Sequence, residues 1–144
     1  MEILIRALEE KDYPAIISIT HNALKFTRLT DENTAAHYSR IKDDDRYKTF
    51  VAVMGGETVG FISSVWSHSV GREVGFMHIT AIAVDERVQG HGIGTKLLNH
   101  MEDYATSIGI DSILLTSGLE RTEAHKFYVK NGYENRALSF TKSL

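Results

Sequence analysis

The chain has 144 residues, of which 42% are hydrophobic and 24% charged, which is ordinary usage for one globular domain and excludes a disordered or collagen-like chain. The absence of cysteine excludes disulfides, a thiolate metal site and a cysteine nucleophile. The net charge of -3 has the wrong sign for a protein that follows a nucleic acid backbone.

No apolar stretch reaches the length of about 20 residues that a membrane span needs, and the first residues lack the basic and apolar parts of a secretion signal. We therefore expect one domain over residues 1–144, located in the cytoplasm, without nucleic acid or membrane partners.

The first 45 residues predict a strand and two helices. Ile3 and Ile5 alternate with other residues as in a strand, and Asp12 precedes a tyrosine and a proline, as an N-cap precedes a helix that ends near Leu24. A second helix is expected over residues 31–41, followed by a solvated loop with three consecutive aspartates.

The middle of the chain predicts antiparallel strands. Apolar runs over residues 50–54 and 58–62 flank the pair Gly55-Gly56, which suits a tight hairpin turn. A further strand is expected over residues 74–84.

The next segment predicts a parallel crossover. Apolar side chains recur at helical spacing over residues 93–108, and Gly109 follows as a C-cap. A short strand over residues 112–116 completes a strand-helix-strand unit.

A last helix over residues 122–131 ends at Gly132, and we expect a C-terminal strand with Leu138, Phe140 and Leu144 on one face. The fold class is therefore α/β, with a mixed, mostly antiparallel central sheet and helices on both faces.

A glycine-rich turn, RVQGHGIGT from Arg87 to Thr95, lies between a predicted strand and the helix over residues 93–108. Glycines allow backbone amides to approach an oxyanion, and a helix start favours negative charge, so the turn suits a phosphate or pyrophosphate. A nucleotide P-loop is excluded because Gly94 is followed by threonine and then lysine, and the glycine spacing does not match a dinucleotide fingerprint. The alternative is a tight turn that binds nothing.

These residues resemble the GNAT superfamily of acetyl-CoA-dependent N-acetyltransferases. Its Gln/Arg-x-x-Gly-x-Gly/Ala turn is matched by Arg87, Gly90 and Gly92, and its Ala-x-x-x-Tyr helix motif by Ala124 and Tyr128. The helix motif is followed here, as in the family, by a glycine and an aromatic residue. The resemblance implies the GNAT fold and acetyl-CoA as co-substrate.

The resemblance also implies a coenzyme site. The pyrophosphate would contact the motif residue Arg87 and the backbone amides of Gln89, Gly90, His91, Gly92, Gly94 and Thr95. The main chain of Ile82 and Val84 would pair with the pantetheine arm, while their side chains remain equally good core residues.

By the same resemblance Tyr128 would be the general acid that protonates the departing thiolate, although an aromatic residue on a helix can equally be core. Relatives often have a carboxylate near the position of His78; a histidine there can relay a proton or simply be satisfied within the sheet. Glu123 and His68 are weaker candidates for the base. Arg121 stands where many relatives have asparagine, and either holds an anionic group or lies on the surface.

We expect an enzyme that moves an acetyl group from acetyl-CoA to a primary amine of a small molecule, by direct transfer in a ternary complex because no cysteine can carry the acetyl group. The alternatives are acetylation of a protein or peptide amine, and a non-catalytic module that binds acyl-CoA.

The C-terminal half also resembles the aminoalkylphosphonate acetyltransferase subgroup. No zinc motif is present, so no metal is expected, and the alternating C-terminal strand suggests a homodimer. The acceptor would lie among aromatic and polar side chains of the first half: His21, Phe26, Tyr38, Trp66 and His68.

Overall fold

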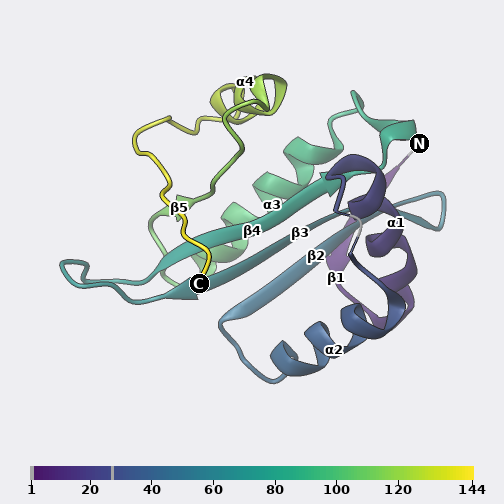
Figure 1. Ribbon diagram of the computed structural model, residues 1–144, viewed down its shortest axis with the longest axis horizontal. Coiled ribbons are helices and arrows are strands. Elements are labelled where there is room, and N and C mark those ends of the chain that lie inside the picture. Colours follow the sequence, from purple (N-terminus) through teal and green to yellow (C-terminus); the bar gives the residue numbers. More distant parts are fainter. Residues whose placement is uncertain (1, 27) are drawn as a thin grey trace. The chain divides into compact units, whose positions relative to one another are not determined.

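Figure 1 shows the computed structural model of the chain, which describes residues 2–26 and 28–144. The chain divides into two compact units, Met1–Leu114 and Leu115–Leu144. Among the described helices, none combines the length and apolar character that a bilayer crossing requires.

The described residues of the larger unit form a five-stranded sheet whose strands lie in chain order. Its strands are β1 (Ile3–Ala7), β2 (Tyr47–Met54), β3 (Glu57–Ser67), β4 (Phe76–Val84) and β5 (Ile113–Leu114). The pairs β1–β2, β2–β3 and β3–β4 are antiparallel and β4–β5 is parallel, which confirms the mixed, mostly antiparallel sheet. The helices of this unit are η1 (Glu10–Asp12), α1 (Tyr13–Ala23), α2 (Asp31–Ile41), η2 (Glu86–Val88) and α3 (Ile93–Ser107).

Different helices cover the two faces of the sheet (Figure 1). Val51, Phe61 and Ala83 pack on one face against the buried side chains of α1 and α2. Phe50, next to Val51 in β2, points to the other face and contacts the rings of His100 and Tyr104 of α3. The apolar stripe of α3 is buried against this second face through Ile93, Leu97, Leu98, Met101 and Ala105. Because successive side chains of a strand point to opposite faces, the sheet contributes apolar side chains to one core layer on each face.

The predicted hairpin is confirmed between β2 and β3. Gly55 and Gly56 have φ angles of 59° and 80°, the left-handed conformation that both central residues of a type I′ turn adopt. The turn sets a register in which Met54 lies opposite Glu57.

The smaller unit contains α4 (Thr122–Lys130), which ends before Gly132 as predicted. The expected C-terminal strand is wrong: residues 133–144 have no regular secondary structure, and Leu138, Phe140 and Leu144 are exposed. An alternating pattern marks a possible strand face, but a strand also needs a neighbour whose main-chain groups pair with it. Among the described residues, no strand pairing extends beyond Leu114.

A buried carboxylate joins β1, β3 and the start of α1. Asp12 is 1% exposed, and its carboxylate accepts hydrogen bonds from both terminal nitrogens of Arg6 (2.8 and 2.9 Å), the Glu9 amide (2.8 Å) and the Thr58 hydroxyl (2.7 Å). α1 begins directly after Asp12, as predicted, but the Asp12 side chain does not cap α1. Burial raises the pKa of Asp12, but the bonds from Arg6, Glu9 and Thr58 outweigh it and hold the pKa below its ordinary value.

We expect Asp12→Asn to lower the free energy of unfolding at pH 7 by about 2–4 kcal/mol, because the Arg6 guanidinium loses its buried carboxylate partner. Since the native pKa of Asp12 is lowered, its contribution is fully present above the ordinary carboxyl pKa of about 4 and is lost as the pH falls through the native value. Urea denaturation between pH 7 and pH 2 should therefore show the two proteins converging in acid. Asp103→Asn, which changes an exposed carboxylate of α3, is the control, and equal stability of Asp12→Asn and wild type at pH 7 would contradict the assignment.

Candidate functional site

The glycine-rich turn connects the end of β4 to the start of α3 through η2. Gly90 and Gly92 have φ angles of 82° and 79°, which side chains rarely tolerate, and a Cβ atom at either position would meet nothing within 4 Å. The backbone conformation, and not lack of space, therefore requires glycine at both positions. The space in front of this backbone is open.

The backbone amides of this turn form an unpaired row. Val88 N–H bonds the Asp85 carbonyl, and Lys96 N–H makes the first bond of α3, to the Gly92 carbonyl at 3.1 Å. Between them, the amides from Gln89 to Thr95 have no partner among the described residues. No side chain caps α3, and its first turn carries no acidic residue. Free amides at the positive end of a helix dipole are the physical basis of an anion site.

β4 has an open edge beside this turn. β5 pairs only with Met77 and His78, so the rest of β4 has no strand on that side within the described residues. Asp85 N–H bonds the Val59 carbonyl at 2.7 Å, which fixes the alternation of the β3–β4 ladder. The main-chain groups of Ile82 and Val84 must consequently point away from β3, toward the open edge. The Gln89 amide side chain reaches the Val84 carbonyl there, at 3.0 Å.

A bulge separates the two halves of β4. The register shifts between Ser63 and Ser64 of β3, because Ala81 pairs with Ser63 and Ile79 with Ser64. Thr80 is left without an opposite residue, and its hydroxyl donates to the Ser63 carbonyl at 3.2 Å. Such an extra residue bends a strand, which is consistent with β4 pairing with β5 only before the bulge.

Side chains of the turn hold its own backbone. The Arg87 guanidinium bonds both oxygens of Asp85 and, at 2.8 Å, the Glu57 carboxylate beside the hairpin turn. The bonds from Arg87 lower the pKa of Asp85. His91 Nδ1 lies 3.0 Å from the Val88 carbonyl and 3.1 Å from that of Gln89, so this nitrogen carries the proton and donates.

Arg87 thus ties the turn to the β2–β3 hairpin. The sequence predicts Arg87 at the pyrophosphate but does not predict both of its carboxylate partners. Asp85 was detectable as an acid two residues before the arginine. Nothing in the sequence associates Glu57, 30 residues away, with this turn.

His78 lies on the sheet face covered by α1 and α2. It is half-buried and pairs with Val65 of β3 and Leu114 of β5. Val65 is four residues beyond Phe61 in β3, and Phe61 packs against α1 and α2, so Val65 and the opposite His78 share that face. Its neighbour Met77 is fully buried on the α3 face.

Tyr128 belongs to the smaller unit, where it is half-buried on α4. Its ring packs edge-on against Phe127 at 5.4 Å and Tyr133 at 6.2 Å between centroids. Burial raises the pKa of the Tyr128 phenol, and the charge of Arg121 lowers it by less, so the net shift is upward. The phenol therefore keeps its proton at neutral pH and can act as a donor.

The expected acceptor residues fall into separate places. His21 Nε2 lies 2.9 Å from the Leu29 carbonyl, an acceptor, so this nitrogen donates. Tyr38 is buried, and its ring stacks on that of Tyr13. Phe26 is 57% exposed. Trp66 and His68 lie edge to face, 5.3 Å between ring centroids, and line a common cavity. No group of the described residues could hold a metal ion.

Comparison with known proteins identifies the family of this chain. The profile of the acetyltransferase (GNAT) family matches residues 5–133. The chain belongs to the GNAT family of acetyltransferases. The aminoalkylphosphonate N-acetyltransferase of Salmonella typhimurium is 31% identical to this GNAT chain over 132 residues, which are 92% of the chain and 82% of the relative. GNAT enzymes use acetyl-CoA, so the chain is an acetyl-CoA-dependent acetyltransferase, as the resemblance of its motifs predicted.

Solved structures confirm the GNAT fold. The glucosamine-6-phosphate N-acetyltransferase of Arabidopsis thaliana has a TM-score of 0.86 at 24% identity, covering 99% of each chain. A structure described as a transcriptional regulator from Bacillus halodurans has a TM-score of 0.91 at 21% identity, covering 99% of this chain and all of the other.

Proposed function

We propose that this GNAT protein transfers the acetyl group of acetyl-CoA directly to a primary amine of a small molecule. The observation that carries the proposal is the row of unpaired amides from Gln89 to Thr95 at the uncapped start of α3. A diphosphate suits this row because consecutive N–H donors and the helix dipole both favour negative charge. In this proposal Gln89, Gly90, His91, Gly92, Gly94 and Thr95 hold the coenzyme pyrophosphate through their main chain.

The open edge of β4 suits the amide-containing arm of the coenzyme. Ile82 and Val84 direct main-chain groups toward this edge, and an extended chain with amides can pair there as an added strand does. Gln89 already occupies the Val84 carbonyl, which leaves the Val84 amide for the arm. In this proposal Arg87 contacts the pyrophosphate, and its guanidinium also fixes the turn through Asp85 and Glu57.

The chemistry requires removal of a proton from the amine and addition of one to the sulfur. The amine nitrogen attacks the thioester carbonyl carbon, and the carbon–sulfur bond breaks with its electrons on sulfur. The Tyr128 phenol donates its proton to this thiolate, which its raised pKa permits because the phenol is protonated at neutral pH. His78 accepts the proton that the ammonium loses, directly or through water. No cysteine is present to hold an acetyl group, so the transfer needs both substrates bound together.

An amine that also carries an anionic group is the acceptor class with the most support. The 31% identical relative is named for aminoalkylphosphonates. In the smaller unit, the charge of Arg121 acts on the Tyr128 phenol, so a cation lies near the proposed proton donor. A guanidinium there suits a phosphonate or phosphate oxygen.

The decisive experiment measures thiol release from acetyl-CoA with a panel of amines. We expect 2-aminoethylphosphonate to be acetylated with a higher kcat/KM than ethylamine, which lacks the anion, and the product to be the N-acetyl amide by mass spectrometry. Acetylation of lysine peptides alone would favour the protein substrate. Tight coenzyme binding without release for any amine would favour a non-catalytic module.

We expect Gly92→Ala to weaken coenzyme A binding by about 10-fold or more, because alanine disfavours the left-handed backbone that presents the amides. Isothermal titration with coenzyme A measures this. Gly56→Ala is the matched control: Gly56 has the same left-handed φ of 80° and open surroundings, but lies in the β2–β3 hairpin turn. Equal losses of affinity in the two variants would contradict the placement of the site.

We expect Tyr128→Phe to lower kcat by about 10-fold to 10⁴-fold while coenzyme affinity changes little, because only proton donation is removed. Steady-state kinetics with the best amine of the panel measure the effect. A variant with wild-type kcat would reject Tyr128 as the acid.

The base is tested in the same assay by His78→Gln, with His68→Gln as the comparison. We expect His78→Gln to lose turnover mainly at lower pH, where more of the amine is protonated, and His68→Gln to keep it. The reverse result would move the proton acceptor to His68.

A further inference from the structure

A cavity of about 480 Å³ lies where α3 ends, at the opposite end of this helix from the glycine-rich turn. Its walls come from the loop before β2, the end of β3, the loop before β4, and the end of α3 with the residues that follow it. They include Asp45, Trp66, Glu73, Tyr104 and Ile110. This volume is within the range of small-molecule sites, about 300–1,000 Å³.

The wall combines aromatic rings with negative charge. Trp66 and Tyr104 supply an indole and a phenol, and both are half-buried. Tyr104 already attracts a cation, because Lys48 Nζ lies 5.5 Å from its ring centroid. Burial raises the pKa of the Tyr104 phenol, and the charge of nearby Asp45 raises it further.

The end of α3 adds further negative potential. Ile108, Gly109 and Ile110 line the cavity directly after the helix, and their backbone N–H groups bond the last carbonyls of α3. The last turn of α3 has no basic side chain to offset this end of the helix dipole.

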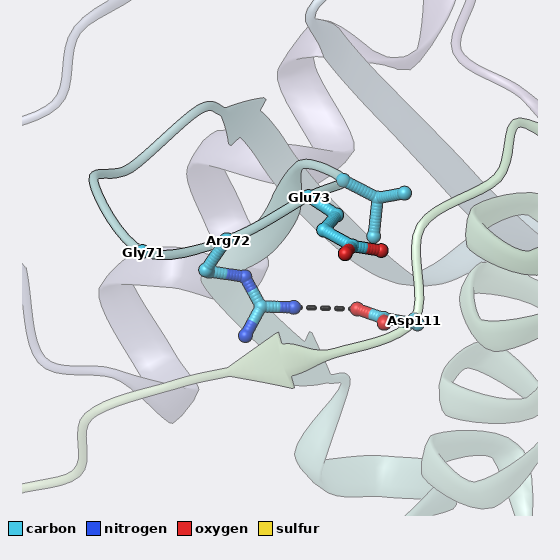
Figure 2. Close-up of a pocket in the computed structure, with 5 residues that line it drawn as sticks. Gly71, Arg72, Glu73 and Asp111 are labelled. Atoms are coloured by element: carbon cyan, nitrogen blue, oxygen red, sulfur yellow. Dashed lines mark hydrogen bonds and ion pairs between the residues drawn. The ribbon is translucent and has the colours of Figure 1, made fainter.

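The carboxylates of the cavity are not neutralised by neighbouring arginines. Figure 2 shows Arg72 directed at Asp111, with which it forms an ion pair, beside Glu73. Arg46, next to Asp45 in the chain, pairs with Asp44. Within the described part of the chain, neither Asp45 nor Glu73 has an ion-pair partner.

The Arg72–Asp111 ion pair anchors the loop that carries Glu73. It joins the loop before β4 to the segment before β5, as Figure 2 shows, and Glu73 lines both the hollow in that view and the larger cavity. The loop that carries Glu73 is thereby anchored at the rim.

We propose that this cavity binds a small organic ammonium ion, with its alkyl groups against Trp66 and Tyr104 and its charge facing Asp45 and Glu73. A metal ion is disfavoured because no group of His, Cys, Asp or Glu side chains in the described ranges is arranged to hold one. The site is distinct from the proposed catalytic residue His78, since Trp66 is directly opposite the α3-facing Met77 and His78 lies on the other face of the sheet. The inference does not depend on the proposed acetyl transfer.

The chain contains a single tryptophan, so its fluorescence reports on Trp66 alone. We expect choline, titrated at constant ionic strength, to change this fluorescence saturably. Its neutral isostere 3,3-dimethylbutan-1-ol should require an at least about 5-fold higher concentration, because only the charge differs. Choline has no N–H to acetylate, so the signal cannot come from turnover at its nitrogen. Equal responses to the two probes, or no saturable response to choline, would overturn the proposal.

Variants test the assigned residues. We expect the double variant Asp45→Asn with Glu73→Gln to weaken choline binding about 5-fold or more, and Tyr104→Leu to do the same, while Tyr104→Phe retains the ring and the affinity. Asp43→Asn is the control, because it removes an exposed carboxylate of the same loop that does not line the cavity. Wild-type affinity in the double variant would refute the role of the carboxylates.

Discussion

The start of α3 is the feature on which the proposed chemistry depends, because it leaves a row of amide donors without partners. An exposed helix start normally acquires a capping side chain, and here none is present. The same helix is held firmly by its apolar stripe, in which Ile93, Leu97 and Leu98 are almost completely buried. The amides are therefore fixed in position before a ligand arrives, so binding an anion requires little ordering of the backbone.

The edge of β4 depends on a defect in the sheet. A regular parallel pairing of β4 with β5 would use the main-chain groups that face the open edge. The bulge at Thr80 interrupts the strand, and pairing with β5 ends at His78. Beyond this point, the main-chain groups of Ile82 and the amide of Val84 face the open edge, close in sequence to the turn that carries the free amides.

GNAT membership establishes acetyl-CoA as the donor and leaves the acceptor to features of this chain. Two charged features of this chain bear on its ligands, one positive and one negative. Arg121 places positive charge near the Tyr128 phenol in the smaller unit, which suits an anionic amine. The cavity beside Trp66 has the opposite charge and suits a cation. Because the two features have opposite charge, our proposals assign them different ligands.

The sequence by itself determined the elements whose signals are local. The helix over residues 31–41, the Gly55-Gly56 hairpin and the long helix closed by Gly109 could all be predicted, because capping, turn chemistry and periodicity act within a few residues. The family motifs likewise depend on short spacings. The C-terminal strand was predicted wrongly, because its alternation is local but a pairing partner is not.

Tertiary structure alone decided the contacts between distant residues. Asp12 was recognisable as a residue preceding a helix, but its burial between Arg6 and Thr58 depends on the packing of β1 and β3. Arg87 was recognisable from a family motif, but its bond to Glu57, which ties the turn to the β2–β3 hairpin, was not. The face that His78 occupies follows from strand register, and the cavity around Trp66 from where α3 ends. Local sequence fixes the conformation of each segment, whereas these contacts depend on how segments far apart in the chain are packed together.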